Sequence, residues 1–116
     1  MSNTSPSYTY AATLDRVIDG DTIDVILDLG FSVQMKARIR LADIDTPEIR
    51  TRNIQEKIRG KAAMARLIEL LGDGSDLVIL SKFYSRGKYG RILGRVFVND
   101  LDVNQILLDE GHAEPY

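Results

Sequence analysis

The stretch that decides the fold is residues 32–42, which read SVQMKARIRLA. Apolar and polar side chains alternate along it without a break. The apolar positions are Val33, Met35, Ala37, Ile39 and Leu41, and the polar positions are Gln34, Lys36, Arg38 and Arg40. Because successive side chains of a strand point to opposite faces, this stretch predicts a strand with one buried face and one face in water.

Two further strands are expected upstream of this stretch. Residues Tyr8–Ile18 and Thr22–Leu29 are rich in Tyr, Thr, Val and Ile, which favour strands. Asp19-Gly20 separates them and is typical of a hairpin turn, because both residue types tolerate a positive φ. Gly30 marks the next turn.

Downstream, the pattern changes to that of a helix. Thr46-Pro47 ends the strand, because proline cannot donate to a sheet and restricts the residue before it. Residues Ile54–Leu71 are predicted to be helical, and Gly72 ends the helix. One apolar stripe at helical spacing supports this, made up of Met64, Leu67, Ile68 and Leu71.

The last third of the chain predicts two strands and a short helix. The strands are Leu77–Phe83 and Ile92–Val98, joined by the loop Tyr84–Arg91, and the helix is Val103–Glu110, ended by Gly111. We therefore expect a mainly β fold with α (α+β): a five-stranded β-barrel of the OB type with two helices, one between strands 3 and 4. It would form one domain over residues 8–116, after a flexible N-terminus over residues 1–7.

The charges are sorted along the chain. A net charge of −2 argues against binding of nucleic acid by bulk positive charge. Two stretches are nevertheless basic, with Arg50, Arg52, Lys57, Arg59 and Lys61 in one, and Lys82, Arg86, Lys88, Arg91 and Arg95 in the other. Sorted charges also describe ordinary solvated faces, so this pattern alone decides nothing.

The sequence says little about the compartment. It contains no cysteine, which is compatible with a reducing cytosol and with an oxidising exterior. No apolar run approaches the roughly 18 residues of a membrane helix, and residues 1–7 lack the basic start and apolar run of a signal peptide. We expect no membrane contact, secretion if a leader was removed, the cytoplasm otherwise, and a monomer by default.

Five carboxylates fall in two short clusters, each at the end of a predicted strand. They are Asp19 and Asp21 in the first cluster, and Asp43, Asp45 and Glu48 in the second. If both strand ends meet at one rim of the barrel, the carboxylates converge and repel one another unless a cation joins them. Ca²⁺ accepts about 6–8 such oxygen ligands. Each cluster taken alone is more simply explained as a turn, where Asp is common.

Two arginines lie where they could join this rim. Arg40 is on the polar face of its strand, shortly before Asp45, and Arg91 closes the loop that contains Lys88 and Tyr89. A guanidinium matches two phosphate oxygens at once, and phosphoryl transfer needs fixed positive charge around its transition state. Surface ion pairs and an ordinary hairpin tip are the alternatives. His112 is the only histidine, and nothing supports zinc or a Ser–His–Asp triad for this chain.

Taken together and in order, these motifs closely resemble the staphylococcal nuclease family over roughly residues 11–113. They are Ile18-Asp19-Gly20-Asp21-Thr22, then Arg40-Leu41-Ala42-Asp43-Ile44-Asp45-Thr46-Pro47-Glu48, then Lys88-Tyr89-Gly90-Arg91. The resemblance implies an OB-type barrel, in agreement with the strand count. It also implies a Ca²⁺-dependent nuclease that cleaves DNA and/or RNA with little sequence preference and leaves 3′-phosphates.

The resemblance assigns roles to individual residues. Asp21 and Asp45 would bind one Ca²⁺ through their carboxylates, and Thr46 through its backbone carbonyl. Glu48 would act as general base or orient the attacking water. Arg40 and Arg91 would bind the phosphate that is cleaved and stabilise its pentacoordinate transition state. Lys88 and Tyr89 would bind a neighbouring phosphate.

The chain departs from the family pattern in two places. Gly87 replaces the acid that precedes the Lys-Tyr-Gly-Arg run in the family. The sequence ends at Tyr116 and does not include the long C-terminal helix of the type member. In the family a tyrosine that stacks on the substrate lies just before that helix, and Tyr116 would supply this ring if it aligns with that position. We expect the first change to affect the loop and its metal and substrate contacts, and the second to affect stability and substrate affinity.

Two other functions stay open at this point. Some family domains have lost catalysis and bind nucleic acid or protein partners, but the retention here of Asp21, Arg40, Asp45, Glu48 and Arg91 favours the enzyme. A plain OB-fold single-strand binder would stack bases on aromatic side chains in a basic groove, and 7% aromatic residues with a net charge of −2 fit this less well.

Overall fold

The alternating stretch forms one arm of a long antiparallel hairpin. In the computed structural model, β2 (Thr22–Gly30) pairs with β3 (Val33–Leu41), with Thr22 opposite Arg40 and Leu27 opposite Met35. The side chains of one face are buried over most of its length: Ile23, Val25, Leu27, Ile39 and Leu41. The predicted strand with one buried face is confirmed. The structure describes residues 7–86 and 91–116, without the side chains of residues 7 and 82–86.

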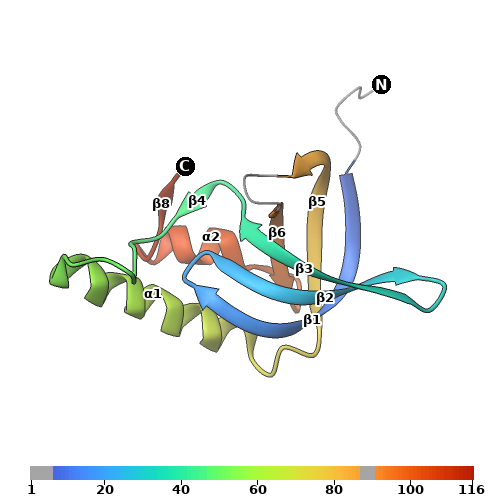
Figure 1. Ribbon diagram of the computed structural model, residues 1–116, viewed down its shortest axis with the longest axis horizontal. Coiled ribbons are helices and arrows are strands. Elements are labelled where there is room, and N and C mark those ends of the chain that lie inside the picture. The colour runs from blue at the N-terminus through green and yellow to red at the C-terminus, as the bar shows by residue number, and fades with distance from the viewer. Residues whose placement is uncertain (1–6, 87–90) are drawn as a thin grey trace.

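The hairpin belongs to a closed barrel, shown in Figure 1. β1 (Ser7–Asp19) pairs with β2 on one side and with β5 (Leu77–Arg86) on the other. β5 pairs with β6 (Ile92–Val98), and β6 pairs in parallel with β3, which closes the barrel. The predicted OB-type fold of five strands with two helices is therefore confirmed.

Three two-residue strands were not expected from the sequence. They are β4 (Ile44–Asp45), β7 (Leu101–Asp102) and β8 (Glu114–Pro115). β4 pairs with β8, so the end of the chain lies beside the segment that follows β3. The predicted end of the fourth barrel strand at Phe83 was wrong, because β5 continues to Arg86, which pairs with Ile92.

The long helix covers one end of the barrel with a face slightly different from the predicted stripe. Helix α1 (Ile54–Leu71) begins at the N-cap Asn53, whose side chain accepts a hydrogen bond from the Glu56 backbone N–H. Its buried residues are Gly60, Ala63, Leu67 and Leu71. Ile68 was wrongly placed in the apolar stripe, because 48% of its surface is exposed. The small residues Gly60 and Ala63 let the helix approach the turns beneath it.

The short helix α2 (Val103–Asp109) packs on β6 and contacts α1. Its buried Asn104 side chain accepts from Val96 N at 3.0 Å and donates to Ala42 O at 2.9 Å and Gly94 O at 3.2 Å. One amide thus connects α2 to β6 and to the end of β3. Among the described residues, no helix is long and apolar enough to cross a membrane.

The tip of the β2–β3 hairpin extends beyond the barrel. Phe31 and Ser32 both have positive φ, 55° and 64°, and Phe31 is fully exposed. The face that is buried near the barrel continues to the tip as exposed apolar side chains, namely Leu29, Val33 and Met35. No part of the described chain covers this end of the hairpin.

We expect Gly74→Ala to lower the free energy of unfolding more than Gly30→Ala. Both glycines have positive φ, +73° and +83°, where an L-residue costs about 1–2 kcal/mol. Only at Gly74 would a new Cβ collide, since it would lie 2.5 Å from Leu14 Cβ, and overpacking adds about 1–3 kcal/mol. Urea unfolding of both variants measures this, and equal losses would contradict the packing described here.

Candidate active site

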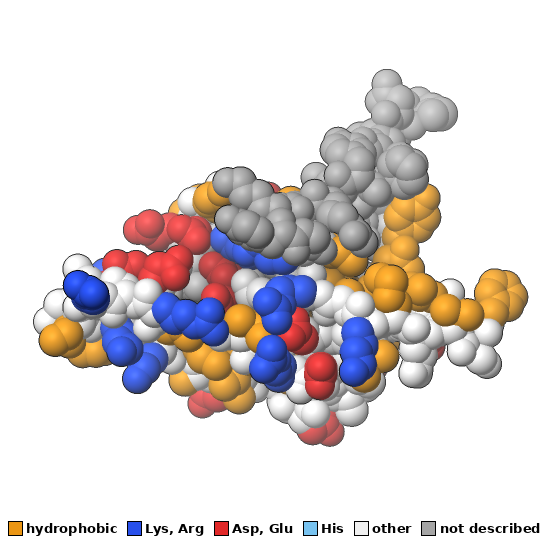
Figure 2. All heavy atoms as spheres, viewed as in Figure 1, with side chains coloured by type: hydrophobic (Ala, Val, Ile, Leu, Met, Phe, Trp, Pro, Cys, Tyr) orange, Lys and Arg blue, Asp and Glu red, His pale blue; other side chains and the backbone are white. Residues whose placement is uncertain are grey.

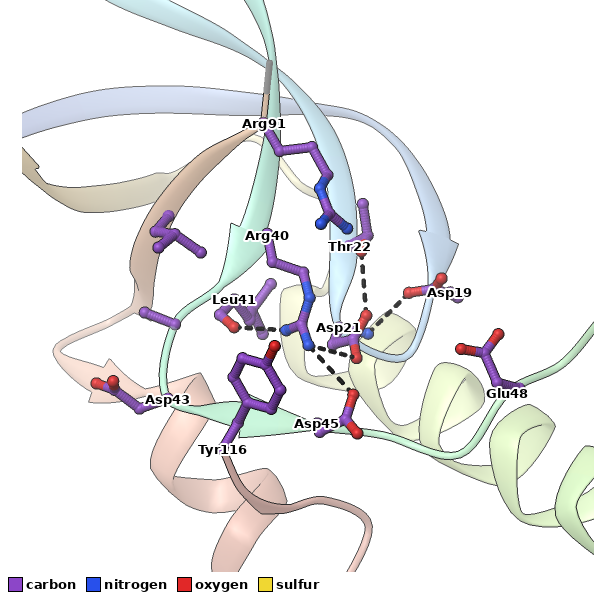
Figure 3. Close-up of a pocket in the computed structure, with 12 residues that line it drawn as sticks. Asp19, Asp21, Thr22, Arg40, Leu41, Asp43, Asp45, Glu48, Arg91 and Tyr116 are labelled. Atoms are coloured by element: carbon purple, nitrogen blue, oxygen red, sulfur yellow. Dashed lines mark hydrogen bonds and ion pairs between the residues drawn. The ribbon is translucent and has the colours of Figure 1, made fainter. Parts of the chain in front are cut away.

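A pocket of about 390 Å³ opens at the rim where the β1–β2 turn, the β3–β4 segment and the start of β6 meet, as Figure 3 shows. All five carboxylates singled out in the sequence line it. With them the lining consists of Asp19, Asp21, Thr22, Arg40, Leu41, Ala42, Asp43, Asp45, Glu48, Arg91, Leu93 and Tyr116. The expectation that the two acidic clusters meet at one rim is thus confirmed.

The β1–β2 turn and the segment after β4 are joined by Asp21. One oxygen of this carboxylate accepts from Thr22 Oγ1 at 3.0 Å, and the other accepts from the backbone N–H of Thr46 at 3.1 Å. Gly20 allows this approach, because a Cβ there would lie 2.8 Å from Thr46 Oγ1. Two turns that are 25 residues apart are therefore connected through one carboxylate.

Arg40 lies between the two acidic clusters, with only 9% of its surface exposed. Its Nη1 donates to the backbone oxygens of Leu41 and Ile44, at 2.8 and 2.9 Å. Its Nη2 lies 3.2 Å from Asp45 Oδ1 and 3.4 Å from Asp21 Oδ2. The guanidinium therefore stabilises the turn after β3 and compensates two carboxylates at once.

Asp19 and Asp21 differ in their protonation. Burial, together with the hydrogen bond and negative charge of Asp21, raises the pKa of Asp19 to about 6. Burial acts on Asp21 in the same direction, but hydrogen bonds from Asp19 and from the Thr46 backbone, with the charge of Arg40, hold the pKa of Asp21 below its ordinary value. Asp21 is thus the ionised partner, and Asp19 keeps a proton in mildly acidic solution.

Glu48 and Arg91 both line the pocket. Glu48 follows Thr46-Pro47, and its backbone N–H donates to Glu56 Oε2 at 3.1 Å, which ties this segment to the first turn of α1. In Figure 3 the Arg91 guanidinium points into the pocket between Arg40 and Thr22, while Glu48 lies on the side of Asp19. Lys88 and Tyr89, predicted to bind a second phosphate, and Gly87 lie outside the described residues.

Tyr116 brings an aromatic ring to the pocket. Its ring centre lies 5.5 Å from the Arg40 guanidinium carbon, and its backbone N–H donates to Asp43 O at 3.1 Å. The pairing of β8 with β4 therefore positions a side chain whose place the sequence left undecided.

Arg95 is a residue of this region that sequence reasoning did not single out as functional. It forms ion pairs with Asp43 at 2.9 Å and with Asp102 at 3.0 Å. Asp102 is also the N-cap of α2, accepting from Gln105 N. The three side chains link the β3–β4 turn, where Asp43 has a φ of 67°, to β6 and α2. The sequence contains one signal for this arrangement, the turn Asn99-Asp100, because Asn and Asp favour the positive φ found there. This turn pairs β7 with β6 and so brings Asp102 back beside the strand that contains Arg95.

The oxygen donors at the rim are of the kind that hard cations prefer, although Arg40 occupies the space between two of them. Within residues 7–86 and 91–116, no three carboxylate or imidazole side chains lie close enough together to hold a metal ion by themselves. A cation would therefore need backbone oxygens and water as further ligands.

Comparison with known proteins agrees with this geometry. The sequence profile of the family described as staphylococcal nuclease homologue matches residues 38–116, more than half of the chain. The chain belongs to the staphylococcal nuclease family. The matched region contains Arg40, Asp45, Glu48 and Arg91, and the structure adds Asp19 and Asp21 from outside it.

This member of the staphylococcal nuclease family is similar to several bacterial proteins. It is 40% identical to Endonuclease YncB of Bacillus subtilis over 101 residues, which cover 87% of this chain and 46% of that protein. It is 38% identical to the SPbeta prophage-derived endonuclease YokF of the same organism, covering 87% and 32%. Micrococcal nuclease of Shigella flexneri is 33% identical, covering 87% and 55%. The chain thus spans from just under a third to just over half of the length of these relatives.

We expect the free energy of unfolding of the protein, minus that of the Asp19→Asn variant, to fall as the pH rises from about 4 to about 7. The pKa of Asp19 is about 6 in the folded protein, whereas the carboxyl of the unfolded chain has its ordinary pKa of 3.8. Between these values the folded state binds more protons, so the stability that this residue contributes is lost as pH rises. Asn keeps an acceptor oxygen for Asp21 N and cannot ionise. Urea unfolding in chelator measures the difference, and a constant value across the range would contradict the raised pKa.

Proposed function

We propose that this pocket hydrolyses phosphodiester bonds of DNA and/or RNA, with Ca²⁺ as the cofactor and little sequence preference. The observation that carries the proposal is the convergence of two guanidinium groups and several carboxylates in one pocket, formed by segments far apart in the chain. Membership of a nuclease family and similarity to proteins named endonucleases support it.

Arg40 and Arg91 would bind the phosphate that is cleaved. Both line the pocket, and negative charge spreads over the phosphate oxygens as the bond to phosphorus breaks. Arg40 is already fixed by two backbone oxygens, so its position costs little reorganisation when substrate arrives. Tyr116 beside Arg40 closes that side of the pocket.

Glu48 is the carboxylate available to activate water. Among residues 7–86 and 91–116 its carboxylate forms no ion pair, whereas Asp45 and Asp21 both contact Arg40. It would take a proton from the water whose oxygen attacks phosphorus, and the bond from phosphorus to the leaving oxygen would break. The family resemblance implies that the phosphate stays on the 3′ side.

The cation would be held by the carboxylates of Asp21 and Asp45 and by the backbone carbonyl of Thr46. All three lie at the junction of the two turns, where Thr46 N already contacts Asp21. When bound, Ca²⁺ supplies a Lewis acid that polarises a phosphate oxygen. Burial contributes most to the raised pKa of Asp19, and the neighbouring Asp21 carboxylate raises it further. A cation at Asp21 would relieve the contribution of that negative charge.

Hydrolysis should require the cation. Purified protein is expected to degrade single-stranded DNA, duplex DNA or RNA after addition of Ca²⁺, and to stop when excess chelator removes it, because the Lewis acid that polarises a phosphate oxygen is then lost. A gel or fluorescence assay across the three substrates measures this. Hydrolysis that continues in excess chelator would remove the metal from the mechanism, and binding without hydrolysis would favour the alternative function, a binding module.

Replacing Arg91 should abolish most activity. Loss of an arginine that stabilises the transition state costs on the order of 10³–10⁵ in rate, so we expect a fall of that size in kcat for Arg91→Ala. Glu48→Gln should also lower kcat while leaving the unfolding curve unchanged. Arg66→Ala is the matched control, because Arg66 forms ion pairs with Glu69 and Glu110 away from the pocket. A loss of only a few-fold for Arg91→Ala would give that residue a structural role.

A further inference from the structure

The cations of the described chain divide into two groups. Those on the barrel and on the far part of α1 are neutralised by ion pairs, as in Arg16 and Arg38 with Asp24, Arg66 with Glu110 and Arg95 with Asp102. A second group forms neither ion pairs nor side-chain hydrogen bonds with any described residue. It consists of Arg50, Arg52, Lys57, Arg59 and Lys61, together with Lys36 on the hairpin.

Five of these six unpaired cations lie within one short segment, residues 50–61, and all five are exposed. We call them the α1 cations. The only acid between residues 49 and 61 is Glu56, which is half-buried and accepts a hydrogen bond from Glu48 N. This segment is therefore strongly positive in a chain whose net charge is −2. At 3.6 residues per turn, Lys57 and Lys61 lie on one side of α1, and Arg59 lies on the other side. Figure 2 shows Lys and Arg side chains over α1, next to the acidic rim.

The α1 cations begin directly beside the candidate active site. Arg50 and Arg52 follow Glu48 by two and four residues, and Glu48 lines the pocket. Arg59 lines a second, adjoining hollow, whose wall shares Asp45 and Glu48 with that pocket and also contains Glu56 and Glu114. That hollow is therefore mainly acidic, and a chain of phosphates that leaves the pocket past Glu48 meets positive charge where it follows Arg50 and Arg52.

We propose that the α1 cations bind the sugar–phosphate backbone of the substrate on the Glu48 side, along the phosphates that lead away from the bond that is cleaved. This inference rests on the proposed nuclease function and adds a second contact surface to it. The helical part of this segment, from the start of α1 to Lys61, is on the order of 10 Å long at 1.5 Å per residue. One strand of a duplex carries a charge about every 3.4 Å of axis, so roughly three phosphates fit there.

Nucleic acid is the occupant that these observations favour, because the positive surface is continuous with a pocket built for phosphate. The exposed face of α1 also contains Ile54 and Ile58, 70% and 58% exposed. A basic helix with exposed isoleucines can also bind an anionic membrane. Vesicles of anionic lipid are therefore the second probe of the experiment.

The experiment measures binding in excess chelator, where no hydrolysis occurs, by fluorescence anisotropy of a duplex of about 20 base pairs over a range of salt. Two double variants remove two cations each: Arg50→Gln/Arg52→Gln in the loop and Lys57→Gln/Lys61→Gln on the helix. The matched control is Arg16→Gln/Lys36→Gln, which removes two exposed cations from the barrel strands. Urea unfolding of all three variants verifies that each remains folded.

Each α1 double variant should raise Kd for the duplex at least several-fold, and should lower the slope of log Kd against log salt by up to about two, at roughly 0.9 per phosphate contact. The control should retain the parent values. In Ca²⁺, the ratio of kcat/KM on the duplex to kcat/KM on a dinucleotide should fall for the α1 variants, because a dinucleotide is too short to reach this surface.

Two outcomes would overturn the inference while the nuclease function stands: α1 variants that hydrolyse and bind the duplex as the control does, or variants that lose binding only to anionic vesicles. Failure of the proposed function gives a different result, namely no hydrolysis by the parent protein in Ca²⁺, whatever its affinity for the duplex.

Discussion

The Arg40 guanidinium is the group on which the arrangement of the site depends. It satisfies two backbone oxygens of the turn after β3 and contacts carboxylates from two separate turns. A buried charge is costly unless it is paired and hydrogen-bonded, so the fold is most favourable when both turns surround Arg40. The same contacts that make the closed barrel rim stable therefore also place Asp21 and Asp45 next to each other. The contacts of Arg40 thus both stabilise the fold at this rim and arrange the carboxylates of the candidate active site.

A second layer of contacts fixes the segment that Arg40 organises. Asn104 hydrogen-bonds to the backbone at Ala42, Gly94 and Val96, and Arg95 joins Asp43 to Asp102. Both side chains come from elements later in the chain, so the turn is completed only when β6 and α2 have packed. The β4–β8 pairing adds Tyr116 to the same wall. The pocket is therefore assembled from tertiary contacts and would be lost early if α2 detached.

The sequence predicts the features that depend on local pattern. The strand over residues 32–42 and the helix Ile54–Leu71 follow from the spacing of apolar residues, and the structure contains both. The two acidic turns follow from turn chemistry, but their meeting at one rim was only a condition of the argument, and it is the structure that shows it. The two-residue strands β4 and β8 could not be predicted, because nothing in four residues specifies a partner 70 positions away. For the same reason Arg95 looked like any surface cation. Ile68 was misplaced because helical spacing defines a stripe but not which edge of it packs.

The hairpin tip has a consequence for the behaviour of the protein in concentrated solution. Phe31 is fully exposed, and the apolar face beside it has no cover in the described chain. Colloidal repulsion between molecules is weak at a net charge of −2 and vanishes near the sequence isoelectric point of about 5.3. Close to that pH little net charge opposes contact between molecules, so the apolar hairpin tip is one surface through which they can associate.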